Sequence, residues 1–68
     1  MNMALKVAIV QSGQTSRAIA QRARIPEVRL SGIVRGRFVA TDDEKAALGK
    51  TLRRDVADIF PSEEAVAS

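Results

Sequence analysis

The chain has 68 residues, 46% of them hydrophobic and 28% charged, and it contains no cysteine, histidine, tyrosine or tryptophan. It is long enough for one domain with a small core, and its composition excludes disulfides, thiolate zinc sites and histidine as a general base. We therefore expect a binding protein rather than an enzyme, with no catalytic residue, metal or other cofactor. We expect one domain over residues 1–60, followed by a flexible tail over 61–68.

The net charge of +3 is unevenly distributed along the chain. Residues 14–37 hold six arginines and a single acid, Glu27, whereas residues 40–68 hold four basic and seven acidic residues. We expect the basic side of the domain to face a polyanion. The two aromatic residues, Phe38 and Phe60, are too few for stacking single-stranded or RNA bases. We expect Phe60 in the core and Phe38 packed beneath the basic segment rather than on DNA.

The first residues, MNMALKVAIVQSG, form an apolar stretch interrupted by Lys6. No basic segment precedes it and no run of about 18 apolar residues exists, so we expect neither a signal peptide nor a membrane span, and a cytoplasmic, nucleoid-associated location. The stretch could instead be a strand entering the glycine loop of a dinucleotide-binding unit. Only Gly13 of the three glycines is present, and no second strand pattern follows. A helix with Leu5, Ala8 and Ile9 on its inner face is preferred.

The apolar spacing of the rest of the chain is also helical, and capping residues divide it into short helices. Gly13 is placed to end the first helix in a left-handed conformation, and Thr15 to begin the second. Gly36 ends the third helix, and Thr41 and Glu44 form a capping box that opens the fourth. The expected helices cover residues 3–12, 15–23 with Thr15 as N-cap, 26–35, 41–53 with Thr41 as N-cap, and 55–60 with Asp55 as N-cap.

Several residues between the second helix and the end of the last helix are informative when taken as a set. They are Ile19 and Ala20 in the second helix, Ile25 after the turn, Leu30 and Ile33 in the third, then Arg35-Gly36-Arg37 and finally Ile59-Phe60. From Leu5 to Phe60 the chain thereby resembles the repressor/Cro type of helix-turn-helix domain, the XRE-like family of the phage λ and 434 repressors. Arg24 departs from that pattern, because the family usually has glycine at this turn position, where φ is positive.

The resemblance implies a λ-repressor-like fold, a compact all-α bundle of four to five short helices that contains a helix-turn-helix. It also implies that the helix from Pro26 lies in the major groove, with its N-terminal half toward the bases. The candidate base contacts are Glu27, Val28, Arg29, Ser31 and Gly32. Arg29 matches guanine O6 and N7, Glu27 the amine of cytosine, and Val28 the methyl group of thymine. Gly32 permits close approach, and Glu27 is alternatively a carboxylate favoured at a helix N-terminus.

Phosphate contacts form a second group of candidates, which positions the protein without reading sequence. These residues are Ser16, Arg17, Arg22, Arg35 and Arg37. Ser16 and Arg17 lie at the start of a helix, where backbone N–H groups point toward an anion. Each arginine taken alone is also explained as a solvated surface charge, so the prediction of phosphate contacts depends on the arginines as a group.

The expected function is that of a sequence-specific duplex-DNA-binding transcriptional regulator. The resemblance favours a repressor that binds a pseudo-palindromic operator as a homodimer, with the dimer surface around Val56, Ile59 and the tail. The expected partners are double-stranded DNA and a second copy of the chain, with no membrane and no small-molecule cofactor. The alternative is a protein-interaction module of the same fold, such as an antitoxin-like or anti-repressor partner, without DNA readout. Arg24 at the turn and Glu27 on the exposed helix give this alternative weight.

Overall fold

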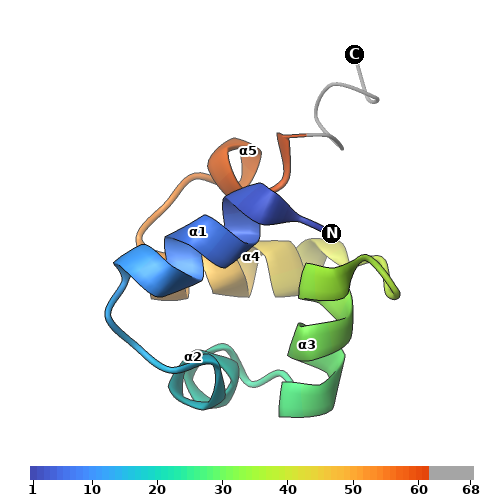
Figure 1. Ribbon diagram of the computed structural model, residues 1–68, viewed down its shortest axis with the longest axis horizontal. Coiled ribbons are helices and arrows are strands. Elements are labelled where there is room, and N and C mark those ends of the chain that lie inside the picture. Colours follow the sequence, from blue (N-terminus) through green and yellow to red (C-terminus); the bar gives the residue numbers. More distant parts are fainter. Residues whose placement is uncertain (62–68) are drawn as a thin grey trace.

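The computed structural model describes residues 1–61, which form five helices and no strand (Figure 1). The helices are α1 (Met3–Gln11), α2 (Ser16–Ala23), α3 (Glu27–Arg35), α4 (Asp42–Leu52) and α5 (Val56–Ile59). The expected all-helical class is confirmed, and the strand alternative is wrong because α1 occupies that stretch. Apart from Pro61, the expected tail lies outside the described residues. None of the helices within residues 1–61 has the length and apolar character that crossing a bilayer requires.

Polar side chains begin three of the helices. The hydroxyl of Thr15 accepts from the backbone N–H of Ala18 at the start of α2. At α4 the expected capping box is confirmed, since Thr41 Oγ1 accepts from Glu44 N and a Glu44 carboxylate oxygen accepts from Thr41 N. Asn2, which the sequence pattern did not single out, caps α1 and also donates from Nδ2 to the backbone oxygen of Ile59. The start of the chain is thereby tied to α5.

Left-handed residues end three of the helices. Gly36 follows α3 with φ 84°, as expected, and Arg24 follows α2 with φ 59°. Arg53 ends α4 in the same way with φ 56°, which was not expected. The third helix begins at Glu27, one residue later than expected, because Pro26 is its N-cap. Non-glycine residues in this conformation are strained by roughly 1 kcal/mol or more, so both arginines are held there by the surrounding fold.

Arg24→Gly is expected to leave the free energy of unfolding unchanged or slightly raised. Glycine relieves the left-handed strain, and the greater freedom of glycine in the unfolded chain offsets part of this gain. Arg22→Gly is the matched control, because it removes the same charge two residues earlier inside α2 and should cost about 1 kcal/mol. Urea denaturation of both variants separates the two outcomes. Equal losses would mean that Arg24 is not left-handed in solution.

The core forms where α2 packs against α3 and α4, while α1 lies against α3 and α5. Figure 1 shows α2 and α3 joined by a short turn and steeply inclined to each other. Ala20 is only 2% exposed, and its small side chain allows the two helices to approach closely. The expected core residues of α2 and α3 are buried, as is Phe60. The buried apolar residues are Leu5, Ala8, Ile9, Ile19, Ala20, Ala23, Ile25, Leu30, Ile33, Ala40, Leu48, Leu52, Ile59 and Phe60.

Candidate nucleic-acid interface

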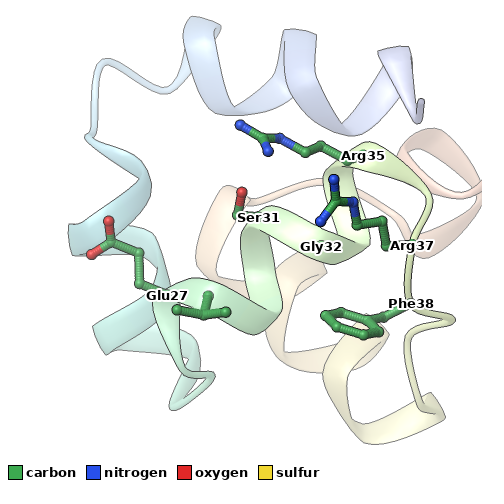
Figure 2. Close-up of a pocket in the computed structure, with 7 residues that line it drawn as sticks. Glu27, Ser31, Gly32, Arg35, Arg37 and Phe38 are labelled. Carbon is green, nitrogen blue, oxygen red and sulfur yellow. The ribbon is translucent and has the colours of Figure 1, made fainter.

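The outward side of α3 borders an open hollow. Figure 2 shows the residues that line it: Glu27, Val28, Ser31, Gly32, Arg35, Arg37 and Phe38. Positions 27, 31 and 35 are four residues apart and therefore follow one another along the same side of the helix. Four of the five candidate base contacts and two of the candidate phosphate contacts thus meet on one surface, which we call the α3 face.

A second hollow continues the α3 face toward the start of α2. It shares Glu27, Ser31 and Arg35 with the first hollow and adds Ser16 and Lys6 to the surface. The N-terminal turn of α2 therefore lies beside α3. The structure does not place all the candidates on this face, because Arg17 and Arg22 are exposed but line neither hollow.

The charge on the α3 face is predominantly positive. Arg35 and Arg37 are exposed, and neither forms an ion pair with any of residues 1–61. Lys6 adds a third cation at the edge, and Glu27 is the one acidic side chain that lines either hollow. The other acids among the described residues belong to the segment from α4 onward. Exposed cations without ion-pair partners within the protein create a positive potential that attracts anions, more strongly at low salt.

Arg29 does not lie as the sequence pattern predicted. Its guanidinium forms a two-point ion pair with Glu44 at the start of α4, with Arg29 Nη2 donating to Glu44 Oε1 at 2.7 Å and Nε donating to Oε2. Nη2 also donates to the backbone oxygen of Val39 at 3.3 Å. Arg29 lines neither hollow. The expectation of a free cation on the exposed side of α3 is therefore wrong, because α4 presents a carboxylate to it.

The ion pair changes the acid–base behaviour of both partners. Hydrogen bonding to Glu44 raises the pKa of Arg29 above its ordinary value. The pKa of Glu44 falls from an ordinary 4.5 to about 2, first through the hydrogen bond from Arg29, with further contributions from Thr41 and the opposite charge. Glu44 is therefore ionised throughout the neutral range and holds α3 against α4. The same carboxylate completes the capping box of α4, so one side chain serves both purposes.

Protonation of Glu44 is expected to destabilise the fold in acid. Because the folded pKa lies below the ordinary value, the stabilisation is complete above pH 4.5 and is lost as the pH falls toward 2. Glu44→Gln should melt at a lower temperature at neutral pH and should lose less stability across that interval. Asp43→Asn is the control, since Asp43 is exposed and forms no ion pair with the described residues. Parallel pH profiles for Glu44→Gln and the parent would contradict this role.

Gly32 is the second departure from expectation. It was expected to permit close approach of DNA to the helix, but it is buried, because the ring of Phe38 lies over it. A Cβ atom added to Gly32 would stand 2.2 Å from Phe38 Cδ2, so a side chain at position 32 requires the ring to move away. Sequence reasoning missed Phe38 as a member of this surface. The available signal was glycine inside a helix, which costs about 1 kcal/mol and commonly marks a close contact.

The expected dimer surface needs a similar correction. Ile59 is 1% exposed and forms part of the core, so it is unavailable to a second copy. Val56 is partly buried against the same core. The third part of that expected surface, the tail, lies outside the described residues.

The α3 face has a mixed chemical character. The face combines unpaired cations, one hydroxyl, one carboxylate and two exposed apolar side chains on and beside a single helix. Comparison with protein-family models, with curated proteins and with solved structures found no match to this chain.

Proposed function

We propose that the protein is a sequence-specific duplex-DNA-binding transcriptional regulator in which α2 and α3 act as a helix-turn-helix. The observation that carries this proposal is the α3 face, where exposed arginines flank the outward side chains of one short helix. The left-handed residue between α2 and α3 supports it, because the sequence resemblance to repressor/Cro domains expects positive φ at that position. The major groove of B-DNA is about 12 Å wide and admits an α-helix.

Base readout is assigned to the side chains near the start of α3. Val28 is 79% exposed and suits the methyl group of thymine, and the Glu27 carboxylate can accept from the amine of cytosine. The hydroxyl of Ser31, one turn further along the same side, can donate to or accept from several bases. Arg29 is not assigned to base readout, because its guanidinium already holds Glu44.

Phosphate contacts are assigned to the edges of the α3 face. Arg35 and Arg37 lie on either side of Gly36 at the end of α3. Ser16 lies at the start of α2, where backbone N–H groups without helical partners favour an anion. Arg17 and Arg22 contribute positive potential from positions away from the two hollows. These contacts would position α3 without distinguishing one sequence from another.

Repression by a homodimer is the mode of action that we propose. A helix of nine residues reads only a few base pairs, so specificity in a genome calls for two copies on a pseudo-palindrome. The two half-sites would be one helical turn apart, roughly 34 Å. Occupancy of a site that overlaps a promoter excludes RNA polymerase sterically, and this requires nothing beyond tight binding.

The test is selection of bound duplexes from a random pool, followed by affinity measurements over a range of salt concentrations. The proposal expects enrichment of a pseudo-palindrome, and an affinity that falls linearly with salt on logarithmic axes. The contrary result is the absence of both enrichment and salt dependence. In that case the α3 face would belong to a protein-interaction module, in which Val28 and Phe38 contact another protein.

A further inference from the structure

We infer that Phe38 supplies the base-reading side chain that α3 lacks at position 32, and that it reads the 5-methyl group of a thymine. The inference rests on the proposed function, because it assigns one residue of the α3 face to one chemical group of duplex DNA. Phe38 lies outside α3, on the segment that joins α3 to α4. It is therefore a specificity residue contributed to the groove by a loop rather than by the helix.

The ring of Phe38 occupies the place where a side chain at position 32 would begin. Its Cδ2 and Cε2 atoms stand 2.2 and 2.3 Å from the ideal Cβ position of Gly32. The glycine thus makes room for an aromatic ring, which is larger than most side chains that position 32 itself would carry. Figure 2 shows the ring on the border of the hollow, on the opposite side from the guanidinium groups of Arg35 and Arg37.

The guanidinium of Arg29 and the backbone of the loop both help to hold the ring in place. The guanidinium carbon of Arg29 lies 5.7 Å from the ring centroid, within the range of a cation–π contact. Arg29 is itself fixed by Glu44 and by the backbone oxygen of Val39. The backbone of the loop is tied to α3, because the N–H groups of Arg37 and Phe38 donate to the oxygen of Gly32 at 2.8 and 3.3 Å. An already ordered side chain loses little entropy on binding.

The part of the ring that remains exposed suits an apolar group within a polyanion. Phe38 is 45% exposed, and Val28, which is 79% exposed, lines the same hollow. Arg35 and Arg37 line the same hollow as these apolar side chains, so a ligand that fills it should bring negative charge as well as an apolar group. In the major groove of duplex DNA the thymine methyl is the apolar group, and phosphates flank it. Charge and apolarity together therefore favour duplex DNA containing thymine.

The experiment replaces the thymines of the selected site by uracil one at a time, and each replacement removes only a methyl group. For the parent protein, one replacement in a single half-site should weaken binding about fourfold through Phe38, the factor expected for one buried methyl group. Phe38→Ala should bind the thymine site correspondingly less tightly and should not distinguish thymine from uracil at that position. Val28→Ala is the matched control, because it should keep the Phe38-dependent difference and lose any difference at its own base.

Gly32→Ala provides a second variant that keeps Phe38 in the sequence. Alanine favours the helix but forces the ring away from α3, so the fold should persist while the thymine–uracil difference disappears. Circular dichroism melting checks that both variants are folded. If the parent selects a site but every thymine–uracil difference survives in Phe38→Ala, the inference is wrong and the proposed function stands. If the parent selects no site and binds duplexes without salt dependence, the proposed function itself fails.

Discussion

Leu48→Ala is expected to lower the free energy of unfolding by about 3 kcal/mol, a typical loss for a leucine removed from a packed core. Leu48 has an exposed fraction of 0% and belongs to α4, which packs against both α2 and α5. The substitution leaves a cavity that the surrounding helices fill only in part. A domain of this length has a total stability of only several kcal/mol, so a large share of it would be lost.

Urea denaturation followed by circular dichroism measures this loss directly. Val10→Ala is the control, because it also shortens an apolar side chain in a helix but at a position that is 71% exposed. Its effect should stay within about 0.5 kcal/mol. A loss below about 1 kcal/mol for Leu48→Ala would show that α4 does not pack against the core in the way described.

The double substitution Arg35→Ala and Arg37→Ala is expected to weaken binding to every duplex, whatever its sequence. Each arginine is assigned one charge-assisted contact to a phosphate, and such a contact commonly accounts for about a tenfold change in affinity or more. The proposed homodimer would lose four phosphate contacts, two in each protomer, so the slope of log affinity against log salt should also fall by about 4. The preferred sequence should remain the same, because phosphate contacts carry no base information.

Lys50→Ala with Arg53→Ala is the matched control for charge. It also removes two positive charges, but near the end of α4 and from exposed residues that line neither hollow. Its salt slope should change much less than that of the arginine pair. If both double variants changed the slope equally, the effect would come from net charge alone, and the docking of α3 would have to be revised. Affinities for the selected site and for random duplex should be compared at one fixed salt concentration.

Local chemistry explains why most of the helix boundaries could be predicted from the sequence. A capping box such as Thr41 with Glu44 is complete within four residues, so no knowledge of the rest of the chain is needed. Gly36 follows from a backbone angle that few residues tolerate, whereas the turn at Arg24 was expected only from the resemblance to repressor/Cro domains. Helical periodicity likewise identified Leu30 and Ile33 as buried, since the apolar stripe of an amphipathic helix packs against the core.

The direction of individual side chains on the surface was decided only by the tertiary structure. Periodicity places Arg29 on the outward side of its helix, but its partner Glu44 comes from a helix 15 residues away in the sequence. The same holds for Gly32, which Phe38 covers from the following loop, and for Ile59, which the core encloses. The guanidinium of Arg29 points toward Glu44 because that carboxylate lies within its reach. Gly32 has no side chain, so the ring of Phe38 can pack directly against the helix there. Both depend on how segments distant in the sequence meet, which neither helical spacing nor capping residues encode.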